Sequence, residues 1–536
     1  MKRKTKLIAT IMSICLVCAV FAIGVFALRT ANLKIGGDVS FSATGVEADI
    51  KNVTLTGATT NDQVLATGSI NTSMTQADID STFQNWQTLK LDFDENATDI
   101  ELKFDIANTS TNADNYIEID YSYTFSNTNP NVDVFPGDEN DQSVWKNNNY
   151  ILAPKGNATD ATYSTFTLKF RVLDNELNVP QDTKVSVNID LKHTTPAVLD
   201  ENGYYNDIKY TLTTGTKNTA AVSGFKNTAT DFNIPAVVSN GSNIFEVTSF
   251  ADNAFQMCPR LTSINIPNSV IDIGDYAFAL TGFTSVVIPN SVLTIGEHAF
   301  TGCSTLESVK LSDTLTNLSE GLFGSCAKLT SIIIPSTVST VSKFYANYDM
   351  NLSEIIVNPR NAVFDSRGGC NAIIETATNK LLYGTAETTI PSSVTSIGNR
   401  AFSSNYSLTS ITIQKNIETI EANAFADCAN LETVVFEDGM KTIGNMAFAA
   451  CGKLTSITIP SSVISMETDV FMSSGLDVVT IDSQAALEYG WVSTDVQTIY
   501  INEDLTIEID ESNLIYDGNF GNYATDKTGY LKFERM

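Results

Sequence analysis

The sequence has very few of the side chains on which most enzyme sites depend. Of its 536 residues only two are histidine, His193 and His298, and charged residues make up 17% of the chain, against a usual share of about a quarter. Nucleophilic triads and catalytic zinc sites use histidine beside fixed partners, and neither histidine has such a partner nearby in the sequence. Acidic side chains are common, but no spacing singles out a catalytic pair. We therefore predict no catalytic residue, no metal ligand and no cofactor.

Basic residues are also scarce. The chain has 32 Lys and Arg against 61 Asp and Glu, which gives a formal net charge of −29. A strongly acidic surface repels phosphate backbones and anionic lipids. We expect no nucleic-acid partner, and contact with a membrane only through the N-terminal segment described below.

Cysteine is confined to few positions. Cys15 and Cys18 lie in an apolar run, and five of the remaining six occupy one position of a repeat: Cys258, Cys303, Cys326, Cys428 and Cys451. In other copies the same position holds Thr281, Asn405 or Ser474, so it requires a small, weakly polar side chain. Cysteines on neighbouring parallel coils also point the same way, which is poor disulfide geometry. The sequence predicts free thiols.

The N-terminus has the pattern of an exported protein. The basic segment "MKRKTK" precedes an uncharged run from Leu7 to Leu28. This run exceeds the usual signal-peptide core of about 7–15 residues and reaches the roughly 18 residues that a membrane-spanning helix needs. Residues 1–31 are therefore either a cleaved signal peptide or a membrane anchor. Both alternatives place the rest of the chain on the extracellular face of the cell surface or in the medium.

Residues 32–195 alternate apolar and polar side chains, as in "DIELKFDIA" (99–107) and "FTLKFRV" (166–172). Period-two alternation between turn-forming clusters predicts an antiparallel β-sandwich. The segment "LKIGGDVSFSATGVEADI" resembles the mature start of camelysin/TasA-type exported β-sandwich proteins, and no metal-ligand motif accompanies it. "DFDENATDIELK" departs from a calcium-binding EF-hand loop at Ala97 and Lys103. A calcium site of another kind stays open there and in "GDENDQ" (137–142).

Residues 196–502 form a repeat. An aromatic residue recurs at Phe255, Phe278, Phe300, Phe323, Phe402, Phe425, Phe448 and Phe471. Aligned on it, the unit reads L-x-x-I-x-I-P-x-x-V-x-x-I-x-x-x-A-F-x-x-C, and "LTSINIPNSVIDIGDYAF" is the clearest copy. A fixed period of about 20–50 residues indicates a solenoid, whose coils bury their apolar faces only against neighbouring coils. The I-x-I-P segment predicts a strand ended by proline. We expect the Ala-Phe pair on the opposite wall of the coil, with Phe filling the coil interior.

The repeat resembles the leucine-rich repeat of BspA-type bacterial surface proteins. The segments "CPRLTSINIPNSV", "CAKLTSIIIPSTV" and "CGKLTSITIPSSV" are near-identical copies, and "YTLTTGTKNTAAVSGF" resembles the segment that begins such domains. The resemblance implies a mainly β fold with a parallel concave sheet and a surface-exposed, ligand-binding or adhesive role. It names no ligand.

Two features interrupt or end the repeat. Between Leu352 and Leu408 the spacing is ten residues too long for two coils, and "AIIE" and "KLLY" around "TATN" predict a small hairpin that projects from the stack. Residues 503–536 alternate apolar and acidic side chains, and we assign them to a C-terminal cap.

The outward residues of the concave strand face are the candidate binding residues. Most are Ser and Thr, but one stretch carries apolar side chains around a lysine: Ser285, Val287, Ser308, Lys310, Ser331, Ile333 and Ile356. Exposed apolar area on such a face favours binding, although β-branched residues also stack well within a sheet.

Three functions remain open. We favour a non-catalytic surface protein whose solenoid binds a host or bacterial surface protein or a glycan. A matrix or filament component that polymerises through the β-sandwich is the alternative, and a surface hydrolase is the third.

Overall fold

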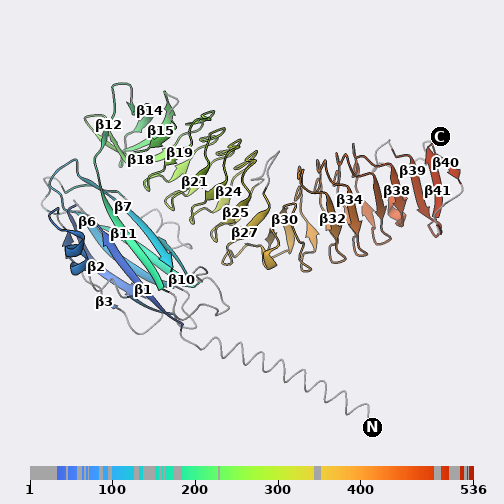
Figure 1. Ribbon diagram of the computed structural model, residues 1–536, viewed down its shortest axis with the longest axis horizontal. Helices are drawn as coiled ribbons and strands as arrows, with labels where there is room; N and C mark the ends of the chain where they lie inside the picture. The colour runs from blue at the N-terminus through green and yellow to red at the C-terminus, as the bar shows by residue number, and fades with distance from the viewer. Residues whose placement is uncertain are drawn as a thin grey trace, which may run out of the picture.

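The computed structural model describes most of residues 33–535. It leaves out residues 1–32 and several internal segments, the longest of which are 137–150, 173–183, 343–351, 488–495 and 506–519. The fold is mainly β, with about 4% helix and a β-solenoid of about 11 turns over the repeat region. Figure 1 shows the N-terminal sheets in blue and cyan, and the solenoid as an elongated stack running from green to red.

The described N-terminal strands form two sheets. One has the order β5 (Leu89–Phe93), β1 (Leu33–Ser42), β11 (Lys184–Thr194), β7 (Tyr116–Phe125), β9 (Ile151–Leu152). The other has the order β3 (Gln63–Val64), β2 (Ala48–Thr56), β6 (Asp99–Asn108), β10 (Ser164–Val172), β8 (Val132–Pro136), with β4 (Gly68–Ile70) also paired to β2. Helix α2 (Gln76–Thr82) begins at a capping box formed by Thr75 and Asp78.

The predicted alternation builds the core between these sheets. Leu102, Phe104 and Ile106 of β6 are fully buried, and the Phe104 ring lies 5.5 Å from that of Phe166 on β10. One detail of the prediction is wrong, because β1 and β11 pair in parallel. Alternation gives the buried face of a strand but not its direction, so the sequence could not reveal this pairing.

A mixed sheet begins the solenoid. Its order is β12 (Ala197–Val198), β17 (Val237–Ser239), β18 (Ile244–Phe250), β15 (Thr219–Phe225), β14 (Ile208–Thr213), β13 (Tyr204–Tyr205). Tyr116 of β7 packs against Ala236 and Val237, which joins this sheet to the N-terminal sandwich.

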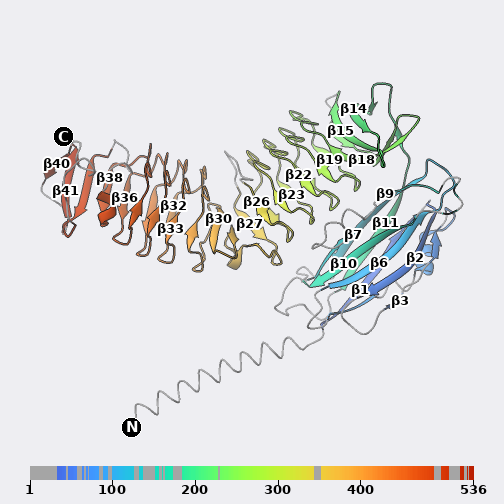
Figure 2. The ribbon, with the colours of Figure 1, turned by 180° about the vertical axis from the view of Figure 1, so that it is seen from behind.

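Each regular coil contributes one longer and one shorter strand, seen from both sides in Figures 1 and 2. The longer strands, whose row we name the long-strand sheet, are β16 (Asp231–Asn233), β19 (Ser263–Asn265), β21 (Ser285–Val287), β23 (Ser308–Lys310), β25 (Ser331–Ile334), β27 (Glu354–Val357), β32 (Ser410–Ile413), β34 (Thr433–Phe436), β36 (Ser456–Ile459) and β38 (Val478–Ile481). They are hydrogen-bonded in separate groups: β16 with β19, β21 with β23, β25 with β27, β32 with β34, and β36 with β38. The shorter ones are β20 (Asp272–Ile273), β22 (Thr294–Ile295), β24 (Asn317–Leu318), β26 (Thr340–Val341), β31 (Ser396–Ile397), β33 (Thr419–Ile420), β35 (Thr442–Ile443) and β37 (Ser465–Met466).

The phenylalanine column fills the coil interior, as predicted. The rings stack from coil to coil, for example Phe425 on Phe402 and on Phe448, with 4.9 Å between centroids in both cases. All three side chains are buried.

The long coil departs from the prediction. It contains β28 (Phe364–Asp365), the 3-10 turn η2 (Arg367–Gly369), and the antiparallel hairpin of β29 (Ala372–Glu375) and β30 (Lys380–Gly384). The hairpin exists but does not project, because Ile373, Ile374 and Leu381 are fully buried. The hairpin joins the row of shorter strands, because β30 pairs in parallel with β31. Ile373 packs into the core that precedes the hairpin and Ile374 into the core that follows it.

An antiparallel pair closes the C-terminal end of the long-strand sheet. Strand β38 is followed by the short turn η3 (Gln484–Leu487), and the sheet continues with β39 (Thr498–Asn502), β41 (Tyr530–Arg535) and β40 (Phe520–Tyr523). This pair covers the last parallel strand at the red end of Figure 1.

Candidate functional site

The predicted binding residues lie together on the outer face of the long-strand sheet. Val287 is directly opposite Lys310 on neighbouring strands, and Ile333 is opposite Ile356. Strands β23 and β25 are adjacent, so the four residues form one line across neighbouring coils. We name this line the apolar stripe.

The apolar side chains of the stripe are open to solvent. Val287 is 63% exposed, Ile333 59% and Ile356 40%. Their neighbours along the strands, Val286, Ile332 and Ile355, are buried, because alternate residues of a strand point to opposite faces. The column beside the stripe carries exposed hydroxyls at Ser285, Ser308 and Ser331, and it ends on the exposed carboxylate of Glu354 beside Ile356. The structure therefore places all seven predicted residues on one face.

The charge of Lys310 acts within its own coil. Burial raises the pKa of Asp313, and the nearby positive charge of Lys310 partly offsets this effect. Asn290 of the preceding coil donates a hydrogen bond to the same carboxylate at 3.2 Å. The charge of Lys310 therefore acts on Asp313 and is not reserved for a ligand. The sequence pattern alone did not indicate this interaction.

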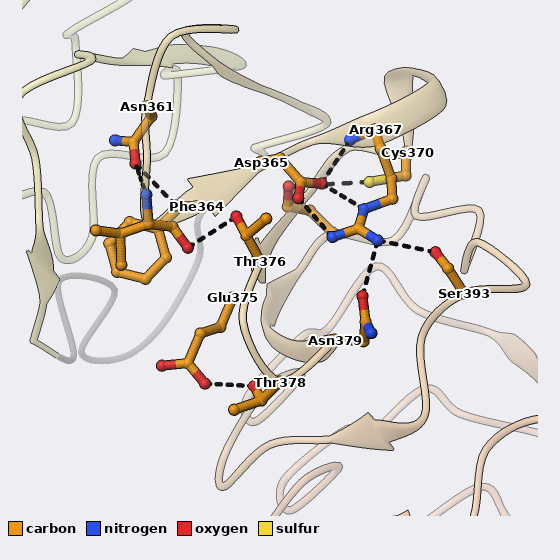
Figure 3. A network of polar contacts seen from close by, with 12 residues as sticks. Asn361, Phe364, Asp365, Arg367, Cys370, Glu375, Thr376, Thr378, Asn379 and Ser393 are labelled. Atoms are coloured by element: carbon orange, nitrogen blue, oxygen red, sulfur yellow. Dashed lines mark hydrogen bonds and ion pairs between the residues drawn. The ribbon is translucent and has the colours of Figure 1, made fainter.

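The long coil forms a fixed rim next to β27. The Val357 backbone N–H donates to Ser366 Oγ at 2.9 Å, which holds the start of η2 against the strand that carries Ile356. Arg367 donates through Nε and Nη2 to Asp365, at 2.7 and 2.5 Å. Its Nη1 reaches Asn379 and Ser393, as Figure 3 shows.

The tip of this rim is made by two glycines in the left-handed region. Gly368 has φ 70° and Gly369 has φ 64°, both are exposed, and side chains rarely tolerate that region. Cys370, the residue that follows them, is buried.

Two left-handed positions flank the Ala-Phe pair of the regular coils. The first, two residues before the phenylalanine, holds Asn253, Tyr276, His298, Gly321, Arg400, Asn423, Met446 and Asp469; the second, two residues after it, holds Met257, Leu280, Gly302, Ser325, Ser404, Asp427, Ala450 and Ser473. All have φ between 54° and 71°. The backbone N–H groups of Tyr276, Phe278 and Leu280 each donate to a carbonyl of the next coil.

These two columns change how the histidines are understood. His298 occupies the first column with φ 56° and stacks on Tyr276 with ring centroids 4.9 Å apart. The side chains at this position vary from coil to coil, and the property that they share is the left-handed backbone conformation. The recurrence of Asn, Asp, Gly and Ser in the two columns is the signal that could have revealed it. His193 lies exposed at the end of β11, with Nε2 3.0 Å from Asn115 Oδ1.

The cysteine column has a specific role. Cys303, Cys326, Cys428 and Cys451 each donate their thiol to the backbone carbonyl of a phenylalanine in the preceding coil, at 3.1–3.3 Å. All six cysteines beyond the N-terminal run are buried and free. Burial raises the pKa of the Cys451 thiol to about 12, so it is protonated at neutral pH.

Several expectations fall on residues outside the described part of the chain. These are the signal or anchor at residues 1–31 and both candidate calcium segments, 92–103 and 137–142, in whole or in part. Within the described ranges, no group of three or more His, Cys, Asp or Glu side chains is placed to hold a metal ion. No helix of the described residues is long and apolar enough to cross a membrane.

The distal end of the long-strand sheet holds residues that the sequence analysis did not select. Asp438, Asp482, Asn502 and Tyr530 line a hollow of about 410 Å³ beside Val435. Nearby, Thr480 is only 6% exposed, although it lies opposite the exposed Thr458 on the neighbouring strand. It is flanked by Tyr500 on β39. Tyr530 and Asn502 lie in the tail, where no repeat pattern marks them.

The repeat region matches a model of the BspA type leucine rich repeat region, in 6 copies, over residues 243–367 and 380–488. The solenoid is similar to PcpA, a pneumococcal vaccine antigen, with 19% identity over 58% of this chain and 91% of PcpA and a TM-score of 0.47. It is also similar to a leucine rich cell surface protein from Faecalibacterium prausnitzii, with 22% identity over 56% of this chain and 94% of that one and a TM-score of 0.41. Comparison with curated proteins gives no significant match.

Repeat regions of this family occur in surface proteins and are typically non-catalytic, which suggests a protein-interaction role. The match also coincides with the stack of parallel coils and with the spacing of its phenylalanine column. Residues 243–367 and 380–488 of this chain are a BspA-type leucine-rich repeat region.

Proposed function

We propose that this chain is an exported, non-catalytic surface protein, and that its solenoid binds a protein partner on a host cell or a neighbouring bacterium through the apolar stripe. Val287, Ile333 and Ile356 are exposed on one line of a face whose adjacent column is polar, with serine hydroxyls followed by the Glu354 carboxylate. This exposure is the observation that carries the proposal. Exposed apolar patches rimmed by polar groups are typical of protein-interaction sites.

A protein partner fits the stripe better than a glycan. A sugar ring is recognised mainly through its hydroxyl groups, and the stripe offers one ammonium group whose charge already acts on Asp313. Three aliphatic side chains instead favour an apolar segment of another protein, since a few buried residues usually dominate the affinity of a protein interface. The rim at Gly368 and Gly369, fixed by Arg367, would bound that segment on one side.

Export rests on the N-terminal sequence. The basic segment before Leu7–Leu28 favours retention of the first residues inside the cell and transfer of the remainder. Fractionation of the producing cells, with protease added from outside, tests this part separately. We expect external protease to degrade the solenoid in cells that export the chain. The solenoid should stay intact in cells that do not export it.

Binding is tested by immobilising the purified chain and screening host matrix proteins, mucins and bacterial surface proteins by surface plasmon resonance. The double variant Ile333→Asp with Ile356→Asp should lose the binding of any partner found, because two charges would be buried in an apolar contact. The fold should survive, since both side chains point away from the core.

A matched control places two aspartates on the same face at a distance from the stripe. Ser410 and Thr433 are exposed and directly opposite each other on β32 and β34, so Ser410→Asp with Thr433→Asp adds the same charge in the same arrangement. This control should bind normally. Equal loss in both double variants would show a general effect of charge, and normal binding in both would reject the stripe.

A further inference from the structure

The hollow at the distal end of the long-strand sheet is an open depression across four successive strands, bordered by the tail. Val435 of β34, Thr458 of β36, Asp482 after β38 and Asn502 of β39 line it. Tyr530, the first residue of β41, lies at its border. Its volume of about 410 Å³ lies in the range typical of ligand sites, about 300–1,000 Å³.

The polar groups of the hollow are fixed in place. Tyr530 donates its hydroxyl to Asp482 Oδ1 at 2.6 Å, and Asn502 Nδ2 donates to the same oxygen at 3.1 Å. The hydrogen bond to Asp482 raises the pKa of Tyr530 to about 12, so the phenol is neutral at physiological pH. The Asp482 carboxylate is thus held in one orientation by two elements that are far apart in the sequence.

The charge of the hollow is uncompensated among the described residues that line it, because two carboxylates, Asp438 and Asp482, are present and no lysine or arginine is. The proximal half of the solenoid offers a direct comparison. Asp313 occupies the same repeat position as Asp438, but the charges of Lys310 and Arg360 act on it.

We infer that the hollow is a binding site for a basic side chain, an arginine or lysine presented by a protein partner. An arginine fork matches paired carboxylate oxygens, while its aliphatic stem can lie along Val435 and Pro460 at the hollow's edge. The site is separate from the apolar stripe and does not depend on it.

The site is tested on the full chain with the probe acetyl-Gly-Arg-Gly-amide, observed through the NMR signals of valine methyl groups. The Val435 signal is assigned with a Val435→Ile variant. We expect a saturable shift of Val435 with the arginine peptide, no shift of Val287, and no shift of Val435 with acetyl-Gly-Gln-Gly-amide. Asp438→Asn with Asp482→Asn should weaken binding of the arginine peptide about tenfold or more, because loss of one hydrogen bond between charged groups changes the affinity by about this factor.

Matched variants keep the test decisive. Asp313→Asn alters the same repeat position as Asp438 without touching the hollow and should leave binding unchanged. Asp482→Asn keeps an acceptor for Tyr530, and an unchanged unfolding temperature confirms the fold. If the double variant unfolds, Asp438→Asn alone should still weaken binding. Three results would each overturn the inference. These are no saturable shift of Val435 with the arginine peptide, unchanged binding by Asp438→Asn with Asp482→Asn, or an equal shift of Val435 with the glutamine peptide or with methyl β-galactoside.

Discussion

At the scale of single residues, backbone conformation explains most of what the repeat consensus leaves unexplained. Two positions per coil adopt left-handed φ values, and the residues found there range from glycine to methionine and leucine. Left-handed conformation costs roughly 1–2 kcal/mol for a residue with a Cβ atom. The solenoid therefore contains correctable strain at the non-glycine members of both columns.

Replacing Ala450 with glycine should stabilise the chain. Ala450 has φ 56°, and relief of its strain should exceed the roughly 0.4–1 kcal/mol that glycine adds to the entropy of the unfolded chain. We expect a net gain of about 0.5–1 kcal/mol in the free energy of unfolding, measured by urea denaturation. Ala447→Gly is the control: Ala447 is buried and outside the left-handed region, so this variant should lose about 1 kcal/mol. A loss at position 450 would show that its strain is negligible.

The thiols should be inert in the folded chain. Burial raises the pKa of the Cys451 thiol to about 12, whereas the hydrogen bond with Cys326 lowers the pKa of Cys303. Only the thiolate reacts with iodoacetamide, and burial keeps the reagent away from Cys303 as well. The six buried cysteines should remain unlabelled at pH 8 and become fully labelled in urea, as counted by mass spectrometry without reductant. A mass two units lower per pair in the native chain would reveal disulfides and contradict the hydrogen bonds to the phenylalanine carbonyls.

At the scale of elements, the repeat was predictable because it is periodic. The strand register, the buried Phe425 and the outward Ile333 all follow from one spacing, which the structure confirms. The features that the sequence missed break the period. Three of them depend on contacts between distant segments: the direction of β1, the burial of Ile373 and Ile374, and the position of Tyr530 beside the hollow. No local pattern encodes such contacts.

The long coil offers a test of how non-repeating elements fit the stack. A Cβ atom added at Gly384 would overlap with the ring of Phe402, which is stacked on Phe425 and cannot easily move. Gly384→Ala should therefore destabilise the fold by about 1–3 kcal/mol. At Gly452 an added Cβ meets no atom within 4 Å, so Gly452→Ala should change stability by less than about 0.5 kcal/mol. Equal thermal shifts in the two variants would contradict the packing at β30.

At the scale of the whole molecule, the described residues of the solenoid form two large hydrophobic cores. One extends from Ala197 to Ile373 and the other from Cys370 to Phe533, and they meet at β29. Because coils interact only with their neighbours, damage should spread within a core more readily than across this junction.

Phe425→Ala tests this division. Loss of a fully buried ring should cost about 3–5 kcal/mol, and its partners Phe402 and Phe448 belong to the second core. Hydrogen–deuterium exchange should rise in peptides from residues 396–481 and stay unchanged in peptides from residues 263–334. Equal acceleration in both ranges would mean that the two cores unfold as one unit.

The central claim is that a partner contacts the apolar stripe. Ser331 and Ser456 occupy the same exposed repeat position, one beside the stripe and one in the distal half. The most direct measurement is photo-crosslinking of the bound partner from benzoylphenylalanine placed at each position in turn. The account predicts a covalent adduct from position 331, whether or not position 456, which lies beside the hollow, also gives one. An adduct from position 456 alone, or from neither position while binding persists, would contradict it.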